Sequence, residues 1–147
     1  MVQKQVIGKW LRGVVIAVAA LLTFGIIEGV EPVSASVSRP VPTLFFHGWG
    51  SSSHAEDHMA KAAVNAGVTG TIIHANVDRS GHVKLVGQIP KGSKSPIVEV
   101  NYANNRDANY KTDGQWAKNV VVALQKRYHI QKFNMVGHSM GNMAIVY

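Results

Sequence analysis

Short apolar runs alternate with amphipathic segments from residue 43 to the end of the chain. Runs of this kind, bounded by glycine, proline and small polar residues, predict β-strands. The predicted strands cover residues 43–46, 71–77, 83–89, 97–102 and 132–136. Segments between them repeat apolar residues every three or four positions, which predicts helices after Ser53, after Thr112 and from Met140 to Tyr147.

Two of the helices begin with a capping-box spacing. Ser53 and Glu56 stand three apart, as do Thr112 and Gln115, and such pairs satisfy backbone amides at a helix start. We expect Gly67 to end the first helix. The apolar face of the first helix is predicted to hold Ala55, Met59, Ala62, Ala63 and Ala66. That of the second is predicted to hold Trp116, Val120, Ala123, Leu124 and Arg127 or Tyr128.

The predicted order of elements is strand, helix, hairpin, strand, helix, strand, helix. Such alternation implies βαβ units and therefore an α/β fold, with a mostly parallel sheet flanked by helices. The turn signal Asp78-Arg79-Ser80-Gly81 joins the strands at 71–77 and 83–89, so this pair is an inserted β-hairpin. An all-α or all-β fold leaves either the strand runs or the helical faces unexplained.

The first 35 residues follow another pattern. Lys4, Lys9 and Arg12 precede an uncharged apolar stretch at 13–27, and Val33-Ser34-Ala35 supplies small residues for cleavage. This layout predicts a secretory signal peptide. The apolar stretch is shorter than the ~20 residues that span a bilayer comfortably, and an uncleaved N-terminal membrane anchor is the alternative.

Either interpretation places the rest of the chain outside the cytoplasmic membrane, secreted or at the cell surface. We therefore divide the chain into a signal peptide at 1–35, a linker at 36–41 and the N-terminal part of an α/β domain at 42–147.

Composition narrows the classes of protein and partner. A chain of 147 residues with 46% hydrophobic and 16% charged residues suits one globular domain. The net charge is +7, but the basic residues are scattered and no nucleic-acid motif accompanies them. We expect no nucleic-acid partner and a weak association with an anionic cell wall or membrane surface. There is no cysteine, which excludes disulfides, cysteine nucleophiles and thiolate metal sites.

The sequence Gly137-His138-Ser139-Met140-Gly141 falls between a predicted strand and a predicted helix. A serine hydroxyl is a poor nucleophile unless it is exposed, placed beside a base and set under donors that stabilise an oxyanion. A Gly-x-Ser-x-Gly turn projects Ser139 outward, while Gly137 and Gly141 avoid clashes with the strand and helix. The amide of Met140, at the start of the helix, is a candidate oxyanion donor.

A second motif, His47-Gly48-Trp49-Gly50, follows the first predicted strand, about ninety residues upstream of the first motif. The loop after an early strand supplies the other oxyanion donor in folds with this serine turn. The amide of Trp49 is our candidate donor, and Gly48 lets the backbone approach closely. The two motifs at this separation are more specific than either motif alone.

Together the two motifs, behind an apparent signal peptide, resemble the α/β-hydrolase superfamily over residues 41–147, and most closely its exported bacterial cell-surface serine hydrolases of unknown substrate. The resemblance implies an esterase- or lipase-like enzyme acting on an acyl substrate, with Ser139 as nucleophile and no metal or cofactor.

In this superfamily the acid and the base follow the serine, in the order Ser, Asp/Glu, His. Residues 140–147 contain none of these acids or bases. We therefore expect a truncated or partial reading frame. The alternative function is a non-catalytic fragment with at most a binding role at the cell surface.

The remaining polar and aromatic candidates have more ordinary interpretations. His47 and His138 are expected to support the two turns rather than to act as bases. His54 and His58 stand at a spacing that can share a metal, but His-x-Glu-x-His is not the metalloprotease order, so a solvated helix face is favoured. For Trp49, simple packing is favoured over a role in the pocket wall. Loop solubility is the favoured role of a polar group after the strand at 97–102: Asn101, Asn104, Asn105, Arg106 and Asp107.

Overall fold

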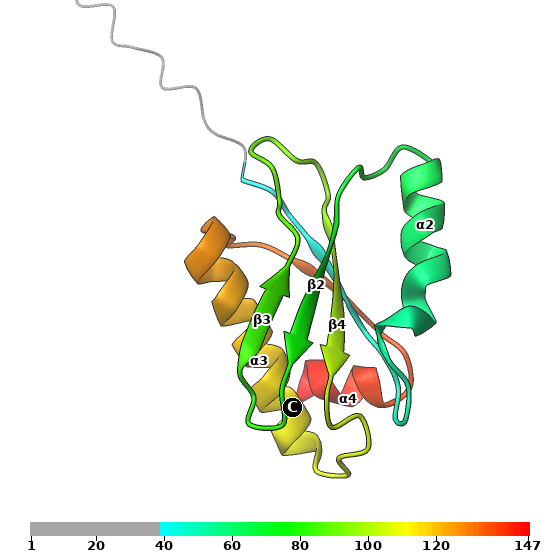
Figure 1. Ribbon diagram of the computed structural model, residues 1–147, viewed down its shortest axis with the longest axis vertical. Coiled ribbons are helices and arrows are strands. Elements are labelled where there is room, and N and C mark those ends of the chain that lie inside the picture. The colour runs from blue at the N-terminus through cyan, green and yellow to red at the C-terminus, as the bar shows by residue number, and fades with distance from the viewer. Residues whose placement is uncertain (1–38) are drawn as a thin grey trace, which may run out of the picture. The chain divides into compact units, whose positions relative to one another are not determined.

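Residues 39–147 are described by the computed structural model, and they form a five-stranded sheet with helices on both faces (Figure 1). The predicted signal peptide and the start of the predicted linker lie outside the described residues. The strands are β1 (Thr43–Phe46), β2 (Ile72–Val77), β3 (Val83–Val86), β4 (Ile97–Tyr102) and β5 (Asn134–Gly137). The helices are the 3-10 turn η1 (Ser53–Glu56), α2 (Asp57–Asn65), α3 (Tyr110–Tyr128) and α4 (Met140–Val146).

The strand order in the sheet is β3-β2-β4-β1-β5. β2, β4, β1 and β5 run parallel to one another, and β3 pairs antiparallel with β2 at one edge of the sheet. The predicted α/β class, the mostly parallel sheet and the inserted hairpin are therefore confirmed. Phe46 at the end of β1 pairs with Gly137 at the end of β5. Because parallel strands share a carboxyl edge, the loops after β1 and β5 emerge side by side.

Side chains of β1 alternate between the two faces of the sheet. Leu44 and Phe46 are fully buried in the larger core, which they share with Trp116 and Val120 of α3. Phe45 packs on the opposite face, in a smaller cluster that includes Ala60 of α2. Helices α3 and α4 therefore cover one face and α2 the other, and α3 and α4 lie together in Figure 1 while α2 stands apart.

Helix α3 confirms its predicted core face, since Trp116, Val120 and Leu124 are buried. Its predicted start is wrong. The N-cap is Asn109, whose side-chain oxygen accepts a hydrogen bond from the amide of Lys111. Asparagine is among the strongest N-cap residues, so the helix begins before the proposed capping box at Thr112 and Gln115. No helix in the stretch 39–147 is long and apolar enough to cross a membrane.

The start and the apolar face predicted for the first helix are both wrong. The segment Ser53–Glu56 is a 3-10 turn without a side-chain cap, and α2 begins only at Asp57. Glu56 and Ala60 point inward, whereas Met59 is 49% exposed. The tighter 3-10 turn changes which side of the following helix faces the sheet. Because the segment is rich in alanine, the spacing of its apolar residues does not reveal this change. Gly67, with φ +70°, follows the helix as predicted.

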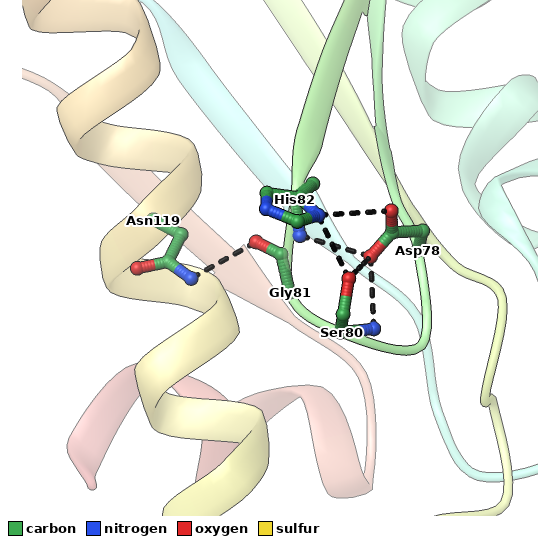
Figure 2. A network of polar contacts seen from close by, with 5 residues as sticks. All are labelled: Asp78, Ser80, Gly81, His82 and Asn119. Carbon is green, nitrogen blue, oxygen red and sulfur yellow. Dashed lines mark hydrogen bonds and ion pairs between the residues drawn. The ribbon is translucent and has the colours of Figure 1, made fainter.

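The turn between β2 and β3 is fixed at the carboxyl edge of β2 (Figure 2). The Asp78 carboxylate accepts hydrogen bonds from the amides of Ser80 and His82, and from the Ser80 hydroxyl at 2.6 Å. The Ser80 hydroxyl is the main cause that lowers the pKa of Asp78 to about 2. Asn119 of α3 donates to the carbonyl of Gly81 at 2.9 Å, which docks the turn on the helix.

Candidate active site

The backbone of Ser139 occupies a rarely populated conformation. Its φ of 53° and ψ of −117° lie outside the regions that residues with side chains normally adopt. Such a residue typically stores about 1–3 kcal/mol of strain. β5 ends two residues earlier, at Gly137, and α4 begins at Met140. The chain thus reverses sharply at Ser139 and leaves this side chain exposed.

The two glycines of the motif are sterically required. A Cβ on Gly137 would lie 2.6 Å from the amide nitrogen of Asn142. A Cβ on Gly141 would overlap the carbonyl oxygen of Phe46 and lie 2.8 Å from its carbonyl carbon. Both obstacles are backbone atoms, which cannot move aside as a flexible side chain can. The turn therefore tolerates only glycine at these positions, because strand, turn and helix pack in direct backbone contact.

The loop after β1 packs tightly against this turn. A Cβ on Gly48 would lie 3.2 Å from the Cβ of Ser139. The amide of His138 donates to the carbonyl of Phe46 at 3.0 Å, which ties the two loops together where their strands end. The fold therefore brings together the two motifs that the sequence separates by about ninety residues.

Ser139 opens into a hollow of about 470 Å³. The residues lining it are Trp49, Ala108, Tyr110, Ser139, Met140 and Met143. The lining thus joins the predicted nucleophile to both residues predicted to supply oxyanion donors, and the other lining side chains are apolar or aromatic. Trp49 is 57% exposed, so the expectation that it simply packs is wrong.

The start of α4 leaves one amide without an acceptor in the helix. The amides of Gly141 and Asn142 donate to the carbonyls of His138 and Ser139. Met140 is the first residue of the helix, so its amide has no intrahelical acceptor. A free amide beside an exposed serine hydroxyl is the geometry that stabilises an oxyanion.

His47 is fully buried and uses both of its ring nitrogens. Nε2 accepts a hydrogen bond from the amide of Tyr102 at 3.3 Å, so the proton of the neutral ring is on Nδ1. That nitrogen donates to the carbonyl of Gly48 at 2.8 Å. Burial lowers the pKa of His47, although the bond to Gly48 opposes the shift. A neutral ring bonded at both nitrogens orders the loop and is not free to take a proton from Ser139.

No histidine or carboxylate between residues 39 and 147 is hydrogen bonded to the Ser139 hydroxyl. His138 is the nearest histidine in sequence, and it is exposed. Its charge lowers the pKa of Glu56, but burial is the larger effect and raises the pKa of this carboxyl. Residues 39–147 therefore present an exposed serine beside the free amide of Met140, and within this range no partner is placed to activate the hydroxyl.

A second serine does lie beside a histidine and an aspartate, but on the hairpin turn. The Ser80 hydroxyl is 2.8 Å from Nδ1 of His82 as well as bonded to Asp78 (Figure 2). The His82 and Asp78 side chains are 86% and 55% exposed. Water screens such a group, and its bonds satisfy the backbone of a tight turn. We therefore interpret it as a turn-stabilising network.

The solvent-exposed face predicted for His54 and His58 has the expected exposure, because both histidines are exposed. Within the described part of the chain, no cluster of three or more histidine or acidic side chains could hold a metal ion.

Two features near the site escaped the sequence analysis. Asn101 near the end of β4 and Asn105 in the loop after it were expected to serve only solubility. The Asn101 side chain instead accepts a hydrogen bond from the amide of Ser53, and the Asn105 side chain donates one to the loop after β1. Asp113, in the first turn of α3, is fully buried, and neither carboxyl oxygen has a hydrogen-bond partner. Burial, assisted by the charge of Asp107, raises the pKa of Asp113 to about 6. In the sequence, the contacts of Asn101 and Asn105 were indicated only by the position of these polar residues at the carboxyl end of a parallel strand.

A parallel sheet that carries a Gly-x-Ser-x-Gly turn between β5 and α4, beside the loop after β1, defines the α/β-hydrolase class. The chain belongs to the family described as alpha/beta hydrolase of unknown function (DUF915), which matches residues 31–147. The resemblance to α/β-hydrolases noted from the two motifs is therefore confirmed.

Solved structures that are similar to this chain include those of two bacterial proteins. One is the product of the gene lin2722 from Listeria innocua, with a TM-score of 0.69 and 28% identity over 74% of this chain and 43% of that protein. The other is a protein from Lactobacillus plantarum WCFS1 provisionally described as a cell surface hydrolase, with a TM-score of 0.60 and 26% identity over 73% of this chain and 44% of that protein. The chain thus spans less than half the length of either structure. Comparison with curated proteins finds no match.

Proposed function

We propose that this chain carries the nucleophile and oxyanion hole of an exported serine hydrolase that acts on an ester or related acyl substrate. The observation that carries the proposal is the strained backbone of Ser139, which turns its hydroxyl into a hollow shared with Trp49 and Met140. Strain of this kind persists only where surrounding contacts impose it, and it clusters at functional sites.

In the proposed reaction, the Ser139 oxygen attacks the acyl carbon and forms a tetrahedral intermediate. The amides of Trp49 and Met140 donate hydrogen bonds to the oxygen that becomes negative. A histidine accepts the hydroxyl proton and a carboxylate orients that histidine; we assign neither role to a residue of this chain. Supporting roles fall to the residues that shape the two turns: His47, Gly48, Gly50, Gly137, His138 and Gly141.

The lining of the hollow favours an apolar acyl group. Trp49, Tyr110 and Met143 contribute large apolar or aromatic surfaces, and no charged side chain lines the hollow. A charged acyl group would lose hydration there without gaining a partner. We therefore expect neutral acyl esters to be preferred over esters of dicarboxylic acids.

Export and surface location form part of the proposal. The pattern of residues 1–35 and the description of the Lactobacillus plantarum relative both support it. The net charge of +7 favours a weak, salt-sensitive association with an anionic cell wall or membrane surface. Cell fractionation tests this: we expect the protein outside the cytoplasm, and partly released from the wall by salt.

Labelling with a fluorophosphonate tests the catalytic proposal. We compare labelling of the parent protein with that of its Ser139→Ala variant. The same comparison is made for the product of the whole reading frame if that frame continues past Tyr147. We expect labelling to disappear in Ser139→Ala and to persist in the control Ser80→Ala, which alters the other serine that lies beside a histidine. Equal labelling of the parent and Ser139→Ala would falsify the proposal.

Ester turnover by residues 36–147 decides between this proposal and a non-catalytic fragment. Turnover that vanishes with Ser139→Ala would rule out the fragment interpretation.

A further inference from the structure

We propose that Asn105 is a positioning residue that aims the Trp49 amide into the oxyanion hole, an inference that rests on the proposed function. It follows from the contacts between two loops that emerge from adjacent strands. The 47–52 loop follows β1, and the 103–109 loop follows β4, which pairs with β1. β4 continues beyond the end of β1, since Val100 pairs with Phe46 and the strand ends at Tyr102.

The direction of the Trp49 amide is set through the peptide unit that it shares with Gly48. A trans peptide is planar, so its N–H and C=O groups point in opposite directions. The Gly48 carbonyl accepts hydrogen bonds from Nδ1 of His47 at 2.8 Å and from the amide of Ser51 at 3.2 Å. Fixing this carbonyl therefore fixes the Trp49 amide, which points away from both donors.

Asn105 holds the other side of Trp49. Its main-chain carbonyl accepts a hydrogen bond from the amide of Gly50 at 2.7 Å. Its side-chain amide donates to the carbonyl of Ser51 at 2.6 Å. Asn105 is thus hydrogen bonded to both Gly50 and Ser51, the two residues that follow Trp49, as an acceptor for the first and a donor for the second. The Gly48–Ser51 turn cannot rotate without breaking at least one of these bonds.

Further contacts beside those of Asn105 hold the 47–52 loop against β4 and the loop that follows it. The Asn101 side-chain oxygen accepts from the amide of Ser53 at 3.2 Å. The Arg106 guanidinium lies 5.4 Å from the centre of the Trp49 ring, a cation–π distance. Gly50 has a φ of +69°, which only glycine adopts readily, and this brings its amide to Asn105. The loop after β4 therefore contacts the two residues that follow Trp49, as well as the Trp49 ring.

Asn104 provides the matched control within the same loop. Its side chain donates to Asp107 at 3.2 Å, inside the 103–109 loop. Both asparagines are half-buried and next to each other in sequence. The Asn105 side chain reaches the loop that follows β1, whereas the Asn104 bond stays within its own loop.

The first experiment measures amide hydrogen exchange and does not depend on activity. We compare Asn105→Ala with Asn104→Ala in the full chain. In Asn105→Ala we expect exchange of the Gly50 and Ser51 amides, which are both hydrogen bonded in this turn, to rise by at least ~10-fold, since a free energy of ~1.4 kcal/mol for one bond corresponds to a factor of ten. In Asn104→Ala we expect less than ~3-fold. Equal exchange in the two variants would overturn the inference.

The second experiment measures the rate of fluorophosphonate labelling. A displaced oxyanion donor costs roughly 10- to 100-fold, less than the complete loss of one. We expect this drop in Asn105→Ala, in kcat rather than KM where turnover is measured, and no more than a ~2-fold change in Asn104→Ala. Faster exchange without slower labelling would refute the positioning role and leave Ser139 as the nucleophile. If the parent shows no labelling that depends on Ser139, the proposed function fails, and the positioning role fails with it.

Two further substitutions separate positioning from folding. Asn105→Asp keeps the shape of the side chain but sets an oxygen against the Ser51 carbonyl, so we expect slow labelling as in Asn105→Ala. Asn105→Gln keeps the amide donor on a longer stem, and we expect it to restore part of the rate. If all three variants instead show a similar drop in melting temperature, and Asn105→Gln does not label faster than the other two, Asn105 has a purely structural role. That result would overturn the proposal.

Discussion

Replacing Asp113 by asparagine should stabilise the protein at neutral and alkaline pH. Asp113 is fully buried in the first turn of α3, and both of its carboxyl oxygens lack hydrogen-bond partners. The Tyr102 hydroxyl is also buried and unpaired, and the Asp113 charge adds to the burial that raises the pKa of Tyr102. An ionised carboxylate here is costly, because nothing replaces its lost hydration.

The magnitude follows from the pKa of about 6 in the folded protein, compared with an ordinary value of 3.8. A raised pKa means that the folded state binds the proton more tightly than the unfolded state. Stability from this group is therefore fully present below pH ~4 and is lost as the pH rises through about 6. Each pKa unit corresponds to ~1.4 kcal/mol, so the loss by pH 8 reaches ~3 kcal/mol at most.

Urea unfolding at pH 4.5, 6 and 8 tests this prediction, with tryptophan fluorescence or circular dichroism as the signal. We expect Asp113→Asn to be ~1–3 kcal/mol more stable than the parent at pH 8, and about a third of that difference to remain at pH 4.5. Burial also raises the pKa of Glu56 and Glu99, so both proteins keep a residual slope and only their difference reports on Asp113. The same pH dependence in both proteins would refute the reasoning.

Three other substitutions test the architecture. Gly141→Ala would set a Cβ against the Phe46 carbonyl, and we expect it to lower the free energy of unfolding in urea by ~2 kcal/mol or more. The control is Gly92→Ala, whose Cβ meets nothing within 4 Å, so that only the ~1 kcal/mol of positive-φ strain applies. Equal losses of stability in the two variants would argue against the clash. Ser139→Gly relieves the strain at φ 53° and should raise stability by ~1 kcal/mol while it abolishes labelling; a less stable variant would contradict the strain. Asp78→Asn should lose stability chiefly above pH ~4, because the lowered pKa of about 2 means that the folded state favours the charged form; unchanged thermal stability at pH 7 would show that the turn network contributes nothing.

The sequence was sufficient for the fold class because its strands are short apolar runs and its α3 face repeats at helical spacing. β4 and the inserted hairpin followed from Ile97–Tyr102 and from the Asp78 turn. The helix starts were predicted poorly, since a helix begins where a polar side chain accepts a hydrogen bond from a free backbone amide, and several nearby residues could do so. Asn109 and the 3-10 turn at Ser53–Glu56 decided them instead.

The candidate site divides in the same way. Gly137, Ser139 and Gly141 could be predicted because backbone clashes demand glycine beside a sharply turned serine, and that demand is written in consecutive residues. The role of Asn105 could not be predicted, since its partners lie more than fifty residues upstream and meet it only through the pairing of β1 with β4. Asp113 looked like an ordinary acidic residue at a helix start, where the helix dipole favours a negative charge.

The sequence by itself determined the local geometry of the serine turn and the alternation that gives a parallel sheet, because both depend on short-range sterics and periodicity. Only the tertiary structure decided that Trp49 and Ser139 open into one hollow, that Asn105 is hydrogen bonded to the loop containing Trp49, and that Asp113 is cut off from water. Burial and long-range hydrogen bonds arise where strands and helices pack, and no local pattern of residues encodes which side chains meet there.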